Sequence, residues 1–312
     1  MDHILVAKNV TKTYGGHTAL SNISLQIPEN CIYGLLGPNG AGKTSFIRII
    51  NQITQQDSGD IWLNGEPLAP KHIATIGYLP EERGLYKSMK VGEQALYLAQ
   101  LKGLSKNEAK TRLKYWFDRL NIGDWWDKKI QELSKGMAQK IQFVVTVLHQ
   151  PKLLIFDEPF SGFDPINANI IKDEILRLKE NGTSIIFSTH RMESVEELCE
   201  YIALIHKSEK ILDGKLSDIK KAYKNNIFNV GIQVNGEVEA LMQSLKQQFN
   251  ILSSDIDVLE NQLNFKVQLP SSSTGHILAE LSKVSNINKF EETIPSANDI
   301  FIQTVNNKDN GQ

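Results

Sequence analysis

Long hydrophobic runs are missing from this sequence, and cysteine is scarce. Only Cys31 and Cys199 occur, far apart and outside metal-ligand spacing, so neither a disulfide framework nor a zinc site is indicated, and we expect two buried or half-buried thiols. The most apolar stretches, Phe143–Leu148 and Leu153–Phe156, are much shorter than the roughly 20 residues that span a bilayer. Residues 1–4 have no basic flank before an apolar run, so no signal peptide is predicted. We expect a cytoplasmic chain, for which any membrane role must come through a partner.

An excess of charge of one sign is also missing. The chain has 34 Lys and Arg residues against 36 Asp and Glu, a formal net charge of -2, which argues against a nucleic-acid partner held mainly by phosphate contacts. With 41% hydrophobic and 22% charged residues, it has enough apolar material for proper cores. Its 312 residues suggest one large domain plus a smaller one.

A glycine-rich loop lies between an apolar strand and a helix. Residues 37–44 fit the phosphate-loop pattern G-x-x-x-x-G-K-[ST], in which backbone N–H groups and a helix dipole cradle phosphates. In this pattern Lys43 reaches the β- and γ-phosphates and Thr44 offers its hydroxyl to Mg²⁺, while Ser45 is placed for the α-phosphate. The strand–loop–helix context argues against a chance glycine-rich turn. The residues expected to bind ATP here are Gly37, Pro38, Asn39, Gly40, Ala41, Gly42, Lys43, Thr44 and Ser45.

Two consecutive carboxylates follow the apolar run Leu153–Phe156. A hard cation and an attacking water both require oxygen groups at the end of such a strand. We therefore interpret Asp157 as a partner of Mg²⁺ and Glu158 as the general base, a role that typically accelerates a reaction by about 10²–10⁴. Taken alone, Asp-Glu-Pro is equally compatible with the end of a surface strand, and the phosphate loop decides between the two interpretations.

The first two thirds of the sequence predict an α/β domain over 1–216, with a helical subdomain at about 86–150 and a linker over Lys215–Lys224. The predicted strands are Ile4–Val10, Ser24–Ile27, Cys31–Leu36, Gly59–Asn64, Ile76–Leu79, Lys152–Phe156, Thr183–Ser188, Tyr201–His206 and Lys210–Leu212. The predicted helices are Thr44–Asn51, Glu93–Lys102, Lys106–Leu120, Gly136–His149 and Pro165–Glu180.

The remainder, 217–312, predicts a small α+β accessory domain. Its element order up to Thr293 is βαββαβ, the split-βαβ or ferredoxin-like arrangement. The predicted elements are strand Phe228–Val234, helix Glu237–Phe249, strands Ile256–Leu259 and Gln262–Leu269, helix Thr274–Val284, strand Asn288–Thr293 and helix Ala297–Val305.

The residues between the two ATP motifs distinguish among the phosphate-loop families. Leu-Ser-Lys-Gly-Met-Ala-Gln-Lys, 133–140, begins a predicted helix; Ser134 is a good N-cap and Gly136 permits close backbone approach. This motif resembles the signature of the ABC ATPases, usually Leu-Ser-Gly-Gly-Gln. It precedes the carboxylate pair by 157 − 134 = 23 positions, which suits that family. The resemblance covers about 4–215.

The remaining ABC motifs follow in the family's order. The resemblance implies that Tyr14 lies against the adenine, although a tyrosine beside Gly15 would on its own be a turn residue. It also implies that 161–164 is the D-loop, with Asp164 at the other subunit, and that His190 is the switch histidine at the γ-phosphate. In ABC proteins two such domains pack head to tail, and each ATP is held between one phosphate loop and the other copy's signature. We therefore expect a second copy or a sister subunit as partner.

Three residues depart from the family pattern. Glu81 stands where glutamine is usual; it keeps an oxygen acceptor for the metal or water but loses the amide donors. Lys135 replaces the first signature glycine, and its side chain is compatible with facing either the partner's nucleotide or solvent. Met137 replaces the usual signature glutamine.

These variants, with 79–86 and 295–302, resemble the bacterial sodium- and antibiotic-exporter ATPases. That resemblance predicts an ATP-hydrolysing motor subunit on the inner face of the cell membrane, bound to an integral membrane partner, with an accessory domain that regulates, dimerises or only stabilises. The alternative is a soluble ABC ATPase in translation or DNA repair. Against it, the chain has one ATPase domain and only 157 − 43 = 114 positions between its ATP motifs, without sustained heptads. A module that binds ATP without turnover is a third possibility; Glu158 and His190 argue against it, while Glu81 in place of glutamine leaves it open.

Overall fold

The computed structural model describes residues 2–311 except 83, 235–237, 258–260 and 271–273. Two sequence-based expectations, the start of a helix at Glu237 and the end of a strand at 258–259, lie outside the described residues. The described chain divides into two compact units, one up to Leu216 together with the chain from Phe301 onward, and one from Ser217 to Ile300. Each unit is described by itself below.

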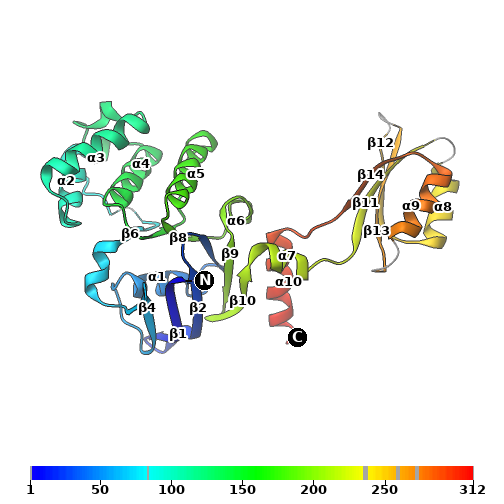
Figure 1. Cartoon of the computed structure of the whole chain (residues 1–312), viewed down its shortest axis with the longest axis horizontal. Coiled ribbons are helices and arrows are strands. Elements are labelled where there is room, and N and C mark those ends of the chain that lie inside the picture. The colour runs from blue at the N-terminus through cyan, green and yellow to red at the C-terminus, as the bar shows by residue number, and fades with distance from the viewer. Residues whose placement is uncertain (1, 83, 235–237, 258–260, 271–273, 312) are drawn as a thin grey trace. The chain divides into compact units, whose positions relative to one another are not determined.

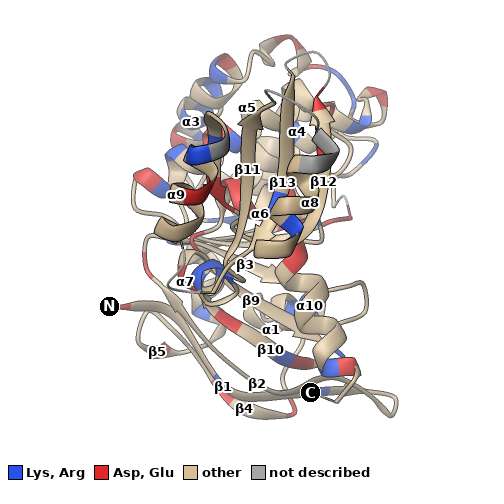
Figure 2. Ribbon diagram, turned by 90° about the vertical axis from the view of Figure 1, so that its right-hand side faces the viewer, with Lys and Arg blue, Asp and Glu red and all other residues tan. Residues whose placement is uncertain are grey.

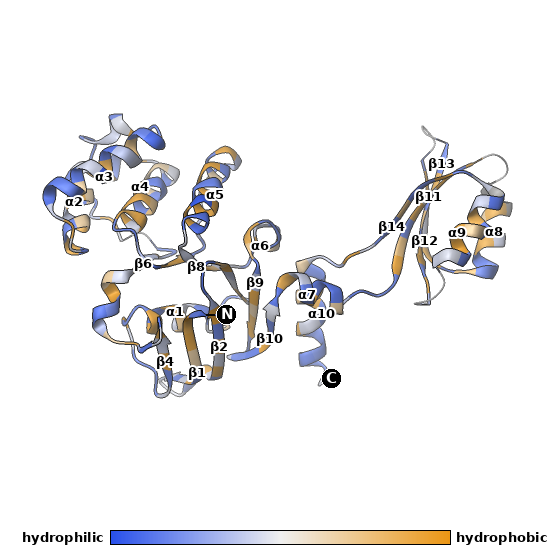
Figure 3. Ribbon diagram, viewed as in Figure 1, coloured by the Kyte–Doolittle hydropathy of each residue, from blue (hydrophilic) through white to orange (hydrophobic). Residues whose placement is uncertain are grey.

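A mostly parallel sheet forms the centre of the first unit (Figure 1). Its strand order is β10-β9-β3-β8-β7-β6, with only β10 antiparallel to its neighbour. The strands are β3 (Ile32–Leu36), β6 (Ile76–Leu79), β7 (Leu153–Asp157), β8 (Ser184–Thr189), β9 (Tyr201–His206) and β10 (Glu209–Lys215). β3, β7 and β8 are buried along their whole length, which explains why they appear as continuous apolar runs instead of alternating ones. Figure 2 shows β3 and β9 free of charged residues, and Figure 3 shows β9 as mostly hydrophobic.

The sheet register brings three chain segments to one edge. Leu36 at the end of β3 pairs with Thr189 at the end of β8, and Asp157 at the end of β7 pairs with Ser188. Because β3, β8 and β7 are adjacent and parallel, the loops that follow them leave the sheet side by side. In open α/β sheets ligands bind outside such carboxyl ends. The phosphate loop, the carboxylate pair and His190 therefore meet at this edge.

A second, antiparallel sheet has the order β2-β1-β4-β5, and its residues share a core with the central sheet. Its strands are β1 (His3–Tyr14), β2 (His17–Pro28), β4 (Ser58–Leu63) and β5 (Glu66–Pro67). β1 and β2 are longer than predicted, because register shifts interrupt their alternation near Asn9 and Asn22, both of which have positive φ. The turn between them falls at Gly15-Gly16, as predicted.

Helix α1 (Lys43–Ile50) inserts Phe46, Ile47, Ile49 and Ile50 into this core. The helical subdomain contains α2 (Val91–Leu101), α3 (Lys106–Arg119) and α4 (Lys135–Val147), near the predicted bounds. Stacked and edge-to-face rings connect it to the sheet: Trp116 of α3 contacts Phe143 of α4, and Phe143 contacts Phe156 of β7, with centroids 5.8 Å apart in both pairs. The first unit also contains α5 (Pro165–Glu180) and the 3₁₀ helices η1 (Pro70–Thr75), η2 (Gly123–Trp125) and η3 (Ile130–Glu132).

Two helices were not predicted. Helix α6 (Met192–Leu198) follows the switch position and buries Met192, Val195 and Leu198. Helix α7 (Leu216–Ala222) occupies the stretch interpreted as a linker. The boundary between the two units falls within this stretch, but its helix was not anticipated, because the basic residues of 215–224 obscure the buried pair Leu216 and Ile219, which lies at helical spacing.

The second unit is an antiparallel sheet with the order β12-β13-β11-β14. With helices α8 and α9 between its strands, this is the split-βαβ arrangement predicted from the element order. Both helices lie on one face of the sheet (Figure 1), where Met242, Leu245, Ile277 and Leu281 join the core. The elements are β11 (Ile227–Gln233), α8 (Val238–Gln248), β12 (Asn250–Asp257), β13 (Gln262–Gln268), α9 (Thr274–Val284) and β14 (Ile287–Glu292).

The last helix, α10 (Ala297–Asp309), brings the chain back to the first unit. Asp309 accepts hydrogen bonds from His206 Nε2 at 2.9 Å and Lys207 Nζ at 2.7 Å, and Lys308 pairs with Glu209 at 2.8 Å. These contacts to the β9–β10 hairpin explain why the chain from Phe301 groups with the first unit, whereas the predicted accessory domain ran to 312.

Both cysteines are buried free thiols, as expected from the sequence. Burial raises the pKa of Cys31 to about 12 and also raises the pKa of Cys199 well above its ordinary range. No helix in the described part of the chain has the length and apolar character needed to cross a bilayer.

Candidate nucleotide site

The phosphate loop follows β3 and depends on glycine at several positions. Gly37, Gly40 and Gly42 have φ of 148°, 81° and 115°. A Cβ at Gly37 would lie 2.2 Å from the carbonyl oxygen of Ile205, and one at Gly42 would lie 2.3 Å from that of Ala19. Around Gly40, by contrast, no described atom lies within 4 Å of the corresponding point. Two glycines thus fit the loop against the protein, and the third leaves open space on the side where a phosphate would bind.

Lys43, the first residue of α1, is buried with 7% of its surface exposed. Its ammonium donates to the carbonyl oxygens of Gly37 at 2.7 Å and Pro38 at 3.1 Å, both within its own loop. Burial lowers the pKa of Lys43, and the nearby carboxylates of Asp157 and Glu158 counteract this in part. The loop therefore holds a cation against the position at which phosphate charge would lie.

Asp157 ends β7 and is only 4% exposed. Burial raises its pKa; the neighbouring carboxylates of Glu81 and Glu158 add to this shift, while the Ser188 hydroxyl and Lys43 oppose it. A buried carboxylate whose ionised form is disfavoured gains from a bound cation.

Glu158 is buried, 8% exposed, and has a left-handed backbone with φ of 49°. Its Oε1 accepts hydrogen bonds from the backbone N–H of His190 at 2.8 Å and contacts His190 Nδ1 at 2.6 Å. Its Oε2 accepts the Thr189 hydroxyl at 3.1 Å. The general-base candidate and the switch histidine, 32 positions apart in the sequence, are therefore in direct contact.

These groups surround one hollow of about 370 Å³. It includes the phosphate loop, Tyr14 from the end of β1, Glu81 after β6, and the carboxylate pair. The described residues that line it are Tyr14, His17, Ala19, Asn39, Gly40, Gly42, Lys43, Thr44, Ser45, Glu81, Asp157 and Glu158. The structure thus brings together candidate residues from four separate segments of the chain.

The hollow fits Mg²⁺ by the chemistry of its oxygen groups. Thr44 offers a hydroxyl, and Glu81 and Asp157 offer carboxylates, which are the hard ligands that Mg²⁺ prefers. Mg²⁺ commonly keeps few protein ligands and completes its shell with water and phosphate oxygens. The three residues predicted as metal ligands therefore line the same hollow as Lys43.

The signature residues do not line this hollow. Ser134 is exposed and caps α4 by accepting a hydrogen bond from the N–H of Met137 at 3.2 Å. Gly136 lies beside the D-loop, because a Cβ there would be 3.6 Å from the carbonyl oxygen of Gly162. Asp164 caps α5 by accepting from the N–H of Asn167 at 3.0 Å. Signature and D-loop therefore lie together on a surface separate from the phosphate loop of their own chain.

Sequence reasoning missed two kinds of residue. His17 and Ala19 line the hollow because His17 pairs with Tyr14 across the β1–β2 turn. The predicted turn at Gly15-Gly16 could have indicated that His17 lies opposite Tyr14. Ser208, in the β9–β10 turn, donates its N–H to the carbonyl oxygen of Ala41 at 3.2 Å and its hydroxyl to that of Thr18 at 2.6 Å. It thereby fastens the phosphate loop to β2, and no local pattern marked it.

Comparison with known proteins identifies the family. Residues 20–161 match the family model described as ABC transporter, and residues 214–305 match the one described as ATP-binding protein DrrA1-3-like, C-terminal domain. The uncharacterized ABC transporter ATP-binding protein YhaQ of Bacillus subtilis (strain 168) is 44% identical over 303 residues, which cover 97% of this chain and 98% of that protein. The chain belongs to the ABC transporter ATP-binding proteins.

Further similarities support this assignment. The linearmycin resistance ATP-binding protein LnrL of the same organism is 31% identical over 281 residues, 89% of each chain. A solved ATP binding subunit of an ABC transporter is 28% identical with a TM-score of 0.66, and the match covers 70% of this chain and 93% of that one. This ABC ATP-binding protein hydrolyses ATP to power transport, as its family does. The predicted family, fold class and transporter ATPase function are confirmed, ahead of the translation and repair alternative.

Proposed function

We propose that this ABC ATPase is the motor subunit of an exporter and that Glu158 is its general base. The observation that carries the catalytic assignment is the position of Glu158: buried beside the phosphate loop, with both carboxylate oxygens held by Thr189 and His190. A base that accepts a proton from water must be oriented before the reaction, and these hydrogen bonds fix its carboxylate plane. The export direction is supported by the likeness to LnrL, a protein named for resistance, and to the DrrA1-3-like C-terminal domain.

Each side chain of the hollow has a distinct proposed role. The loop N–H groups and Lys43 bind and orient the phosphates, and Tyr14 supports the adenine at the other end of the hollow. His190, in contact with Glu158, links the base to the γ-phosphate and would signal whether that phosphate is present. When bound through Thr44, Asp157 and Glu81, Mg²⁺ would supply charge neutralisation to the phosphates.

We infer that the working site needs a second copy or a sister subunit, arranged head to tail. The support is geometric: Ser134, Gly136 and Asp164 present helix ends and a turn to the surface, outside the hollow of their own chain. The amino end of a helix favours an anion, and neither Ser134 nor Gly136 at the amino end of α4 lines the phosphate-loop hollow of its own chain. ATP held between Lys43 of one copy and Ser134 of the other would close the pair, and hydrolysis would reopen it.

Glu158→Gln tests the catalytic proposal. The substitution keeps the size and one oxygen of the side chain but removes its basicity, so we expect hydrolysis to fall by about 10²–10⁴-fold. ATP binding should persist, and with ATP and Mg²⁺ the variant should accumulate as a dimer in size-exclusion chromatography with light scattering. Glu180→Gln, a matched change at an exposed position of α5, should hydrolyse like the natural chain. Unchanged turnover in Glu158→Gln would exclude Glu158 as the base.

The proposed location is the inner face of the cell membrane, through an integral membrane subunit. The test is purification of the chain from membranes in mild detergent, with identification of any polytopic protein that remains bound. A stoichiometric polytopic partner supports the motor proposal. A chain that remains in the soluble fraction without such a partner contradicts it.

A further inference from the structure

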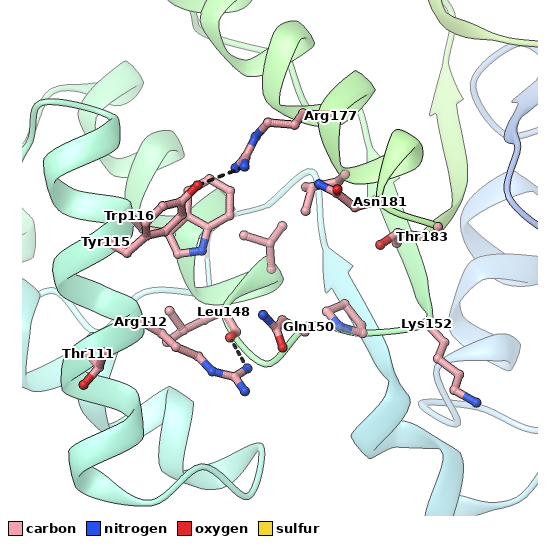
Figure 4. Close-up of a pocket in the computed structure, with 14 residues that line it drawn as sticks. Thr111, Arg112, Tyr115, Trp116, Leu148, Gln150, Lys152, Arg177, Asn181 and Thr183 are labelled. Carbon is pink, nitrogen blue, oxygen red and sulfur yellow. Dashed lines mark hydrogen bonds between the residues drawn. The ribbon is translucent and has the colours of Figure 1, made fainter.

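A second, larger hollow of about 630 Å³ lies in the first unit, between α3, the end of α4 and the end of α5 (Figure 4). We call it the Trp116 hollow. It shares no lining residue with the nucleotide hollow. Its volume is within the range of about 300–1,000 Å³ that holds small organic ligands. The nucleotide mechanism uses none of its side chains.

The floor of the Trp116 hollow is apolar. Trp116 is 6% exposed, Val147 and Leu148 are each 1% exposed, and Pro151 is buried. Such a surface favours a ring or a short aliphatic chain, because each covered Å² of apolar area contributes roughly 25 cal/mol. The floor by itself would select only for hydrophobicity.

The rim carries two arginines, each paired with a carboxylate that does not itself line the hollow. Arg177 lies with its guanidinium carbon 5.9 Å from the Tyr115 ring centroid and 5.6 Å from that of Trp116, and it donates to the Tyr115 hydroxyl at 2.9 Å. Arg112 donates to the carbonyl oxygen of Leu148 at 2.9 Å. Figure 4 shows both guanidinium groups over the hollow, whereas the Lys152 side chain points away from it. None of the described residues that line the hollow carries a carboxylate.

Both arginines keep donors for a ligand. A guanidinium has five N–H groups. Ion pairs with Glu108 and Glu174 orient the guanidinium groups of Arg112 and Arg177, respectively. The hydrogen bonds of each arginine in the structure leave some of its five N–H groups unused. Oriented arginines with spare donors match a carboxylate or sulfonate better than a flexible lysine would.

We propose that the Trp116 hollow binds an amphipathic organic anion, with a ring or aliphatic body on the Trp116 floor and its acidic group on the spare N–H donors of Arg112 or of Arg177. The site also spans two helices with functional ends. α4 begins at the signature cap Ser134 and α5 at the D-loop cap Asp164, and the hollow lies at the opposite ends of both. An anion bound there fixes the spacing of α4 and α5. On the basis of the proposed function, it slows ATP turnover.

Titration with 8-anilinonaphthalene-1-sulfonate, an aromatic sulfonate that fluoresces in apolar surroundings, tests binding without ATP turnover. The full chain is titrated with and without MgADP, which separates the hollow from the nucleotide site. The double variant Arg112→Gln/Arg177→Gln should bind the probe roughly tenfold more weakly, because neither position can then make a charge-assisted contact to the sulfonate. Lys110→Gln, the same charge change at an exposed position of α3, should stay within about twofold of the natural chain. Equal affinity in the double variant overturns the site.

Two further arms define the ligand. Arg177→Lys keeps the charge without the fork and should fall between the natural chain and the double variant; circular dichroism of each variant confirms that it is folded. Octanoate and benzoate should displace the probe, whereas inorganic phosphate, which has no apolar body, should not. Displacement by phosphate at the same concentration would overturn the role of the apolar floor.

The effect on turnover is measured separately. Saturating probe should lower ATP hydrolysis of the natural chain at least roughly twofold and leave the double variant unaffected. Binding without any change in turnover would overturn the effector role. If Glu158→Gln hydrolyses normally, the catalytic proposal fails while the binding titration still stands, so the two failures are distinguishable.

Discussion

Helices α1 and α4 both begin with a lysine, and the two lysines have opposite surroundings. Lys43 is 7% exposed, donates to two loop carbonyls and has Asp157 and Glu158 nearby. Lys135 is exposed, and its aliphatic stem lies over Gly162, where an added Cβ would be 2.5 Å from it. The first helix end thus completes a hollow within its own chain, and the second presents an open surface.

The difference fits the proposed division of the nucleotide site between the phosphate loop of one copy and the signature of another. Burial disfavours the charged forms of Lys43 and Asp157, so the phosphate-loop half gains from phosphates beside Lys43 and from a cation beside Asp157. In the signature half Ser134, Lys135 and Asp164 are exposed, and Ser134 and Asp164 already cap the two helices. The folded chain therefore needs no second copy to satisfy these two helix ends.

The largest expected effect comes from Lys43→Ala, which removes the buried cation. Hydrolysis should fall roughly a hundredfold to a thousandfold, since one preorganised charge at the reacting phosphate is lost. Lys135→Ala is the comparison variant and should keep hydrolysis within about threefold, because an exposed charge is screened by solvent. Steady-state phosphate release measures both. Equal losses in the two variants would contradict the contrast between the helix ends.

Gly136→Asp should impair ATP hydrolysis, which needs the proposed partner-facing half of the site, without weakening nucleotide binding at the phosphate loop. An added Cβ would only reach ordinary contact with the D-loop, 3.6 Å from the nearest atoms, and an acidic residue in the first turn of α4 suits the helix dipole. The single chain should therefore keep its thermal stability and its nucleotide affinity. A carboxylate facing the partner's phosphates should lower hydrolysis at least roughly tenfold by repulsion. Calorimetric titration with ATP and a turnover assay measure the two quantities, and weakened binding by the isolated chain would sink the assignment.

Asp157→Asn should stabilise the folded chain, although it replaces a carboxylate proposed to hold Mg²⁺. The pKa of Asp157 is raised by burial, so its ionised form costs free energy of folding at neutral pH, and a neutral amide avoids that cost. We expect about 1 kcal/mol of added stability in urea unfolding near neutral pH. Because the raised pKa means that the carboxyl becomes neutral as the pH falls through it, this advantage should shrink towards acid pH. An advantage that grows on acidification would contradict the burial argument.

Glu81→Gln restores the residue usual in the family and should have the smallest effect. Glu81 lines the hollow and its carboxylate adds negative charge near Asp157. Its removal should tighten nucleotide binding roughly threefold, by reducing repulsion of the phosphates. It should also raise the Mg²⁺ concentration needed for half-maximal hydrolysis, since an oxygen anion is lost. Glu82→Gln is the neighbouring control, and identical behaviour of the two variants would remove Glu81 from the site.

Much of the site was predictable because its motifs are local. The phosphate loop needs glycine at positions of positive φ, and Ser134 and Asp164 cap helices through bonds to residues three positions away. The split-βαβ order of the second unit was predictable for the same reason, since alternating patterns and short turns specify it. The bulged strands β1 and β2 and the helix α7 were not, because irregular alternation and basic residues hide their patterns.

The sequence by itself determined that a phosphate-binding loop, a carboxylate pair and an ABC signature occur in one chain, since each is a short run with its own backbone requirements. Only the tertiary structure decided which groups meet. Parallel pairing of β3, β8 and β7 places His190 on Glu158, and the β9–β10 turn fastens the phosphate loop through Ser208. The Trp116 hollow likewise exists only because three helices distant in sequence converge. Such contacts depend on packing between distant segments, which no local pattern encodes.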